Sequence, residues 1–156
     1  MWDSLTLHSE FEMRFAPAAV LVLAGFAATG PALAQSGPIG ERKQAMKAMQ
    51  DQAEIGAAMV KGQAPFDAAK AAIIFQAFGD KIKGYGSYFP PGSDTGDTKA
   101  QPAIWSDRAG FDAAIAKFGQ LVADNAAKAG TADGFRSAFV AVTDGCRSCH
   151  QSFKSR

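Results

Sequence analysis

Residues 135–153 read FRSAFVAVTDGCRSCHQSF and carry the clearest periodicity in the chain. Large apolar residues and cysteines recur along this stretch at alternating steps of four and three. The members of the series are Phe135, Phe139, Val142, Cys146, Cys149 and Phe153. Such steps place side chains on one face of an α-helix, and an apolar face is normally buried. The stretch therefore predicts a helix whose buried face holds both cysteines of the chain, one turn apart.

Three further helices are predicted upstream of this one. The first begins near Pro38 and ends at Gly62, with a seam of Arg42, Met46, Met49, Ala53, Gly56 and Val60. The second begins after Pro65 and ends before Gly84, with a face assigned to Phe66, Ala69, Ile73 and Ala77 and widened by Ile74, Phe78 and Ile82. The third extends from an N-cap at Ser106 to Gly130, with a seam of Phe111, Ile115, Phe118 and Val122. The last helix then opens at Thr131 or Asp133.

Residues 85–102 read YGSYFPPGSDTGDTKAQP and are predicted to form a long loop, because Gly, Pro, Ser, Thr and Asp dominate them. Such a loop can cross between two pairs of helices. Each predicted helix has one apolar seam, and an antiparallel four-helix bundle is the simplest arrangement that buries all four. The fold class predicted from the sequence is therefore all-α, an antiparallel four-helix bundle.

The N-terminal segment is predicted to be a signal peptide, residues 1–34. Residues 13–34 read MRFAPAAVLVLAGFAATGPALA, with one basic residue, an apolar run and a small-x-small end that a signal peptidase cleaves. Acidic residues precede Met13, so translation is hypothesised to start there. The apolar run is shorter than the roughly 20 residues of a membrane span, which argues against stable membrane insertion. Residues 35–156 are then one exported domain, in a compartment that permits disulfides.

The motif CRSCH, residues 146–150, predicts a covalently attached haem c. Thiols one helical turn apart can add to the two vinyl groups of a porphyrin, and the following imidazole can then ligate the iron. A disulfide, a dithiol redox pair and a metal site are the alternatives. Zinc normally takes four ligands, and His150 is the only histidine of residues 35–156. The formal charge of +1 gives no basic field for nucleic acid.

In this domain the haem motif lies at the C-terminal end, and the chain resembles the cytochrome c prime (cytochrome c′) family over nearly all of residues 35–156. Family-like stretches are ERKQAMKAM, FPPGS, AQPAIW and CRSCHQSFK. The resemblance implies an up-down-up-down four-helix bundle, for which cytochromes c′ are a standard example. It also implies a periplasmic location, one covalent haem c on the C-terminal helix, and often a homodimer formed through the first two helices.

The resemblance further implies roles for individual residues. Cys146 and Cys149 hold the haem, and His150 is the proximal iron ligand. Met46 stands at the family's distal position, where some members place a methionine ligand and others an apolar cover. Arg42 matches the arginine that reaches a haem propionate, with a solvated surface arginine as the alternative. Lys154 stands where the family often has arginine.

Five further residues are predicted to have packing roles. Met49 is expected to pack against the porphyrin edge, and Met59 to be core. The aromatic residues Phe89, Trp105 and Phe153 are expected near the haem.

Two functions on this fold remain open. With Met46 as a sulfur ligand, the protein carries single electrons between redox partner proteins and is not an enzyme. With Met46 as a mere cover, it binds nitric oxide or carbon monoxide. A third alternative is a haem-free export protein with a Cys146–Cys149 disulfide.

Overall fold

The computed structural model describes residues 37–155. The predicted signal peptide, residues 1–34, and the hypothesised start at Met13 lie outside the described residues. Four long helices form the body of the molecule: α1 (Pro38–Val60), α2 (Ala68–Ile82), α4 (Arg108–Ala126) and α5 (Ala132–Phe153). Shorter turns are η2 (Tyr85–Tyr88), α3 (Ala103–Ser106) and η3 (Ala127–Gly130).

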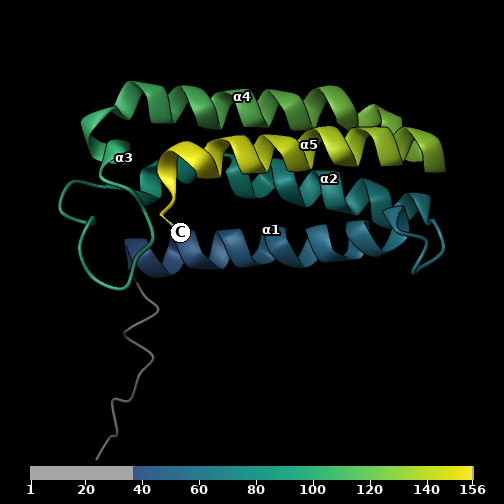
Figure 1. Ribbon diagram of the computed structural model, residues 1–156, viewed down its shortest axis with the longest axis horizontal. Coiled ribbons are helices and arrows are strands. Elements are labelled where there is room, and N and C mark those ends of the chain that lie inside the picture. The colour runs from purple at the N-terminus through teal and green to yellow at the C-terminus, as the bar shows by residue number, and fades with distance from the viewer. Residues whose placement is uncertain (1–36, 156) are drawn as a thin grey trace, which may run out of the picture.

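The long helices lie side by side, and helices that follow one another in the sequence point in opposite directions (Figure 1). Short connections join α1 to α2 and α4 to α5 at one end of the bundle. The long loop joins α2 to α4 at the other end, where the C-terminus also lies (Figure 1). Within residues 37–155 the only extended pairing is a single bridge between Ala100 and Lys154. The predicted all-α, antiparallel four-helix bundle is confirmed.

Phenylalanine rings fill the half of the core that lies near the short connections. The ring of Phe135 contacts those of Phe66, Phe75 and Phe139, with centroids 5.9, 6.1 and 5.4 Å away. Phe75 and Phe135 are both 2 % exposed or less. Burial of rings this large accounts for much of the stability of a small bundle. The other half of the core is different, because it encloses a cavity.

The face predicted for α2 was partly wrong. Ile73 is 55 % exposed and Ala69 is also exposed, whereas Ile74 and Phe75 are buried. The helix carries the run AAKAAIIFQAF, in which neighbouring positions are almost all apolar. Such a run fits several helical faces equally well, so the packing of α2 against α1 and α4 decides which face is buried.

The start of α4 also differs from the prediction. The N-cap is Asp107 rather than Ser106, and its carboxylate accepts a hydrogen bond from the backbone N–H of Gly110 at 3.0 Å. Ser106 instead ends the short helix α3. The predicted start of the last helix and the predicted end of the third are confirmed. Thr131 caps α5, as one of the two predicted starts had it, and the third helical segment reaches Gly130 by way of η3.

Substitution of Asp107 and of the neighbouring Ser106 is expected to have different effects on stability. Asp107→Ala is expected to lower the free energy of unfolding by about 1 kcal/mol, because the first turn of α4 loses its side-chain acceptor. Ser106→Ala is the matched control and is expected to change the same quantity by less than about 0.5 kcal/mol. Urea denaturation of the two variants measures both. Equal losses would contradict the assignment of the cap to Asp107.

Candidate haem-binding site

A cavity of ≈ 430 Å³ lies inside the bundle at the end where the long loop and the C-terminus meet. All four long helices contribute to its walls. Most of the lining is apolar, with Met49, Phe78, Ile82, Ile104, Phe111, Ile115 and Phe118 among the lining residues. All five predicted site residues also line it: Arg42, Met46, Cys146, Cys149 and His150. The structure therefore brings together residues that lie about a hundred positions apart in the sequence.

Cys146 and Cys149 lie on α5, as the periodicity predicted. Both side chains are half-buried, and the sulfurs are free thiols rather than a disulfide. Burial raises the pKa of the Cys146 thiol to about 11 and also raises the pKa of Cys149. Both groups are therefore protonated thiols near neutral pH, unlike the activated thiolates of dithiol redox sites. This environment disfavours the dithiol alternative.

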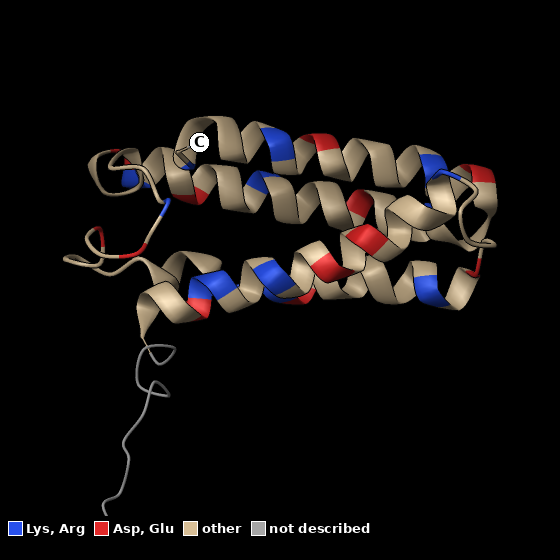
Figure 2. Ribbon diagram, turned by 60° about the horizontal axis from the view of Figure 1, so that its bottom comes forward, with Lys and Arg blue, Asp and Glu red and all other residues tan. Residues whose placement is uncertain are grey.

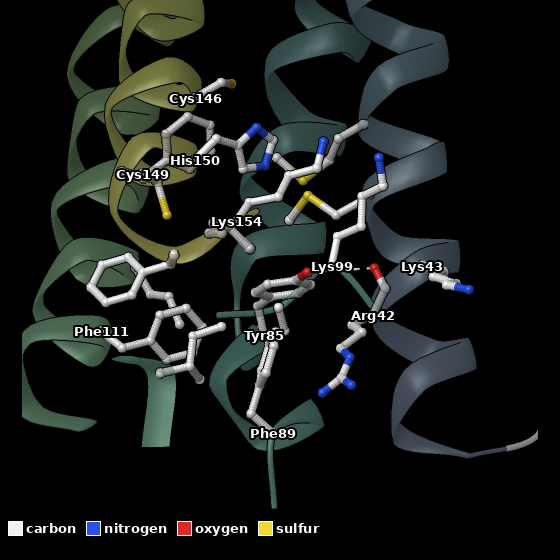
Figure 3. Close-up of a pocket in the computed structure, with 18 of the residues that line it drawn as sticks. Arg42, Lys43, Tyr85, Phe89, Lys99, Phe111, Cys146, Cys149, His150 and Lys154 are labelled. Carbon is white, nitrogen blue, oxygen red and sulfur yellow. Dashed lines mark hydrogen bonds between the residues drawn. The ribbon is translucent and has the colours of Figure 1, made fainter. Parts of the chain in front are cut away.

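His150 follows on the last turn of α5 and lies over the space between α5 and α1 (Figure 3). Loss of hydration lowers the pKa of its imidazole, and the nearby positive charge of Lys154 lowers it further. The imidazole is consequently neutral at pH 7. A neutral imidazole has a free nitrogen lone pair, which is the form that binds a metal.

On the facing side of the cavity, α1 supplies two methionines. Met46 is partly buried and packs against the core, and Met49 is 7 % exposed. Both line the cavity. Met59, further along the same helix, is buried in the core as predicted and does not line this cavity. A thioether from α1 thus faces the same space as the imidazole from α5.

Arg42 is buried, with 4 % of its surface exposed, so the solvated-surface alternative is wrong. Its Nη2 donates to the backbone oxygen of Ser93 at 2.6 Å and to the hydroxyl of Thr98 at 3.1 Å. The guanidinium lies over the rings of Phe89 and Trp105, at 4.7 and 5.7 Å from their centroids. Burial lowers its pKa, and the nearby Tyr85 partly offsets this. Arg42 therefore holds the long loop against α1, and its predicted contact with a haem propionate stays a prediction.

The aromatic residues of the long loop close the end of the cavity. Phe89 and Phe153 line it as expected, and both pack on Phe111, with ring centroids 4.8 and 5.1 Å away. Trp105 does not line the cavity but stacks on Phe89 at 5.9 Å, and its indole N–H donates to the backbone oxygen of Pro90 at 3.0 Å. These aromatic contacts pack the long loop against the end of the cavity and close it there.

Tyr85 and Lys99 are site residues that the sequence alone did not single out. Tyr85 is buried in the cavity wall, and its hydroxyl donates a long hydrogen bond of 3.5 Å to the backbone oxygen of Arg42. Burial raises its pKa well above the usual range of a phenol, so it stays neutral. Both residues lie within residues 85–102, the segment predicted to form a long loop. No local pattern distinguishes a loop residue that turns inward from one that faces water.

These residues fit a covalent haem c. The cavity offers two neutral thiols, one neutral imidazole, two thioethers and apolar walls, which together match a flat hydrophobic cofactor with a central iron. Within residues 37–155, no group of three or more His, Cys, Asp or Glu side chains could hold a bare metal ion. In the same part of the chain no helix is long and apolar enough to cross a membrane.

Comparison with known proteins leads to the same cofactor. The family model for cytochrome c′ matches residues 37–154. A cytochrome c′ of Rhodopseudomonas palustris is 37 % identical over 149 residues, which cover 93 % of this chain and 98 % of the relative. A protein named cytochrome c-556, from Agrobacterium tumefaciens (strain II Chrys), is 32 % identical over 76 % of this chain and 98 % of its own length.

Solved structures agree with the sequence comparisons. The structure of cytochrome c′ from Rhodopseudomonas palustris superposes with a TM-score of 0.74 at 33 % identity, covering 78 % of this chain and 98 % of that one. The structure from Rubrivivax gelatinosus gives a TM-score of 0.68 at 34 % identity, covering 77 % of this chain and 98 % of that one. The chain belongs to the cytochrome c′ family, whose members carry covalent haem c.

Proposed function

We propose that this haem protein is a periplasmic carrier of single electrons. Cys146 and Cys149 hold the cofactor through thioether bonds, His150 is the proximal ligand and Met46 the distal ligand. When bound, the haem supplies an iron that gains and loses one electron. The observation that carries the proposal is the placement of a neutral imidazole on α5 and a thioether on α1 around one cavity (Figure 3).

The chemistry of the cavity supports a sulfur ligand. Residues 35–156 contain no second histidine. Burial raises the pKa of the Tyr85 phenol, and its hydroxyl donates to the backbone oxygen of Arg42, which disfavours it as an anionic oxygen ligand. A thioether is a soft donor that suits haem iron, and His/Met ligation raises the reduction potential. A ligand set that persists in both oxidation states also leaves little to rearrange when an electron moves.

The surface fits transient contacts with redox partner proteins. Lys43, Lys99 and Lys154 line the mouth of the cavity and can steer an acidic partner. Elsewhere, basic and acidic positions alternate along the helices (Figure 2), so the steering is weak. We propose that the protein converts no substrate. The periplasmic location rests on the predicted signal peptide and on the family.

A homodimer stays a prediction. Of the small α1 residues that could permit close approach of a second copy, Ala45 is buried inside the bundle. The large apolar side chains that remain exposed on the first two helices are Ile55 and Ile73, at 43 % and 55 %. These two residues are the apolar surface that α1 and α2 offer to a second chain.

Gas binding is the second candidate function. Met46 is only partly buried and could leave the iron without unfolding α1. One solved relative is a nitric oxide complex of a cytochrome c′ variant from Alcaligenes xylosoxidans, with a TM-score of 0.68 at 29 % identity and coverage of 78 % of this chain and 98 % of that one. In this alternative Met46 covers the iron and yields to nitric oxide or carbon monoxide.

Spectra of the mature protein, expressed together with haem-attachment machinery, test the proposal. The intact mass is expected to include one haem. The ferric protein is expected to be low-spin, with the weak near-infrared band of a sulfur ligand, and the ferrous protein to take up carbon monoxide slowly or not at all. A high-spin spectrum with rapid uptake would favour gas binding. A chain without haem and with a Cys146–Cys149 disulfide would reject both functions.

A further inference from the structure

The cavity is lined by cationic side chains and by no carboxylate. Within the described part of the chain, its charged lining residues are Arg42, Lys43, Lys99 and Lys154, apart from the titratable thiols, phenol and imidazole. The three lysines are exposed at the mouth of the cavity, and only Arg42 is buried. Like charges gathered around an apolar space favour the binding of an anionic group there. A haem supplies such groups, since its edge carries two carboxylates.

Backbone pairing fixes two of these lysines close to each other. The N–H of Ser155 donates to the oxygen of Lys99 at 2.8 Å, and the N–H of Gln101 donates to the oxygen of Phe153 at 3.0 Å. The amide of Gln101 also donates to the backbone oxygen of Lys154 at 3.0 Å. The end of α5 and the long loop are thereby joined. Figure 3 shows Lys99 and Lys154 lying over the space between His150 and Arg42.

The side-chain contacts of Arg42 and Lys43 leave Lys99 and Lys154 as the lining lysines without an ion pair within residues 37–155. The Nη2 of Arg42 is committed to the long loop. Lys43 forms an ion pair with Asp97, with 2.6 Å between Nζ and the carboxylate oxygen. Lys154 also forms no ion pair in this part of the chain, but it is the C-cap residue of α5, whereas Lys99 lies on the loop segment that Arg42 holds. None of the five ion pairs within residues 37–155 includes Lys99.

We propose that Lys99 binds a haem carboxylate, and that Arg42 acts as a positioning residue that holds the loop bearing Lys99. Arg42 bonds to Thr98, the neighbour of Lys99, and the hydroxyl of Thr98 in turn accepts the N–H of Ala100 at 3.1 Å. The ammonium group thus extends from a backbone segment that is fixed on both sides. This assignment rests on haem c occupying the cavity, as proposed above, and not on whether Met46 is a ligand.

A water-soluble carbodiimide tests the contact directly in the haem-loaded protein. The reagent joins a carboxylate to an adjacent amine as an amide, and it carries away the carboxylate oxygen as a urea. Digestion is expected to yield the haem peptide of residues 146–150 linked to a peptide containing Lys99. The link is expected to vanish in Lys99→Gln. It should persist in Lys128→Gln, a control lysine whose ammonium donates to Asn125 at the turn η3, at the far end of the bundle.

A redox titration provides a second readout. Removing a positive charge next to a carboxylate raises the pKa of that carboxylate by about one to three units. The pH-dependent step of the reduction potential is therefore expected to move upward in Lys99→Gln and to stay in place in Lys128→Gln. A haem-loaded protein that couples through Lys43 or Lys154, or whose potential is unchanged in Lys99→Gln, would overturn this assignment alone. A chain without covalent haem would overturn the proposed function as well.

Discussion

Met46→Ala is expected to remove the sulfur ligand from the haem-loaded protein. The near-infrared sulfur band should disappear, and the ferrous form should bind carbon monoxide about 100-fold more tightly. The size follows from a population argument: if Met46 leaves the iron open in only about 1 % of molecules, its removal makes all of them competent to bind. Optical spectra and carbon monoxide titration of the variant measure both changes.

Met49→Ala is the matched control for this experiment. Met49 lies one turn further along α1, lines the same cavity and is 7 % exposed. Its truncation is expected to cost about 2–5 kcal/mol of stability, because a buried methionine leaves a void, while the sulfur band remains. If Met49→Ala abolishes the band and Met46→Ala does not, then Met49 is the distal ligand. If the unmodified protein already lacks the band, Met46 is a cover and the gas-binding function is favoured.

How well each helix could be predicted depended on the contrast between its faces. In α5 most large apolar residues recur at steps of four and three, which marks one face, and Phe135, Phe139 and Val142 are buried as predicted while Val140, outside that series, is 48 % exposed. In α2, Ile73 and Ile74 are neighbours of equal hydrophobicity, yet one is 55 % exposed and the other fully buried. The sequence contains no local information that separates them. The residues of α1 and α4 that pack against α2 determine which of the two isoleucines is buried.

The same distinction applies to the site. Cys146, Cys149 and His150 were identifiable because their motif is local and its spacing has a mechanical reason. The hydrogen bonds of Arg42 could not be predicted from the sequence, because its partners Ser93 and Thr98 lie 51 and 56 positions away. Lys99 enters the site through a pairing with Ser155 across a similar separation. Contacts of this range depend on how the loop folds back, which no pattern in the loop specifies.

The approach of α1 to α5 depends on Gly56, which faces the ring of Phe139. A Cβ atom at this position would come within 2.8 Å of Cζ and 2.9 Å of Cδ2 of that ring, closer than carbon atoms can pack. Phe139 is 5 % exposed and contacts Phe135, so its ring has little room to move. Overpacking costs about 1–3 kcal/mol and the better helix propensity of alanine offsets about 1 kcal/mol of it, so Gly56→Ala is expected to lower the free energy of unfolding by up to about 2 kcal/mol, as measured by urea denaturation.

Gly79→Ala, in the last turn of α2, is the matched control and should have the opposite sign. The nearest atom to its added Cβ is Cγ1 of Val122 at 4.0 Å, so the methyl fits. Alanine is about 1 kcal/mol more favourable than glycine inside a helix, and that gain is expected here without a packing penalty. The gain in helix propensity is common to both variants, so their stabilities are expected to differ by the packing penalty of about 1–3 kcal/mol. Two equally stabilised variants would mean that α1 and α5 lie further apart than described.

The consequence of Gly56→Ala should extend to the iron site, because α1 also carries Met46 and α5 also carries His150. Pushing the two helices apart at Gly56 weakens whatever bond spans the cavity between them. The sulfur band is therefore expected to disappear at a lower temperature in Gly56→Ala than in the unmodified protein, and at the same or a higher temperature in Gly79→Ala. A band that melts together with the helices in both variants, with no earlier loss in Gly56→Ala, would show that this packing contact and the distal ligand act independently.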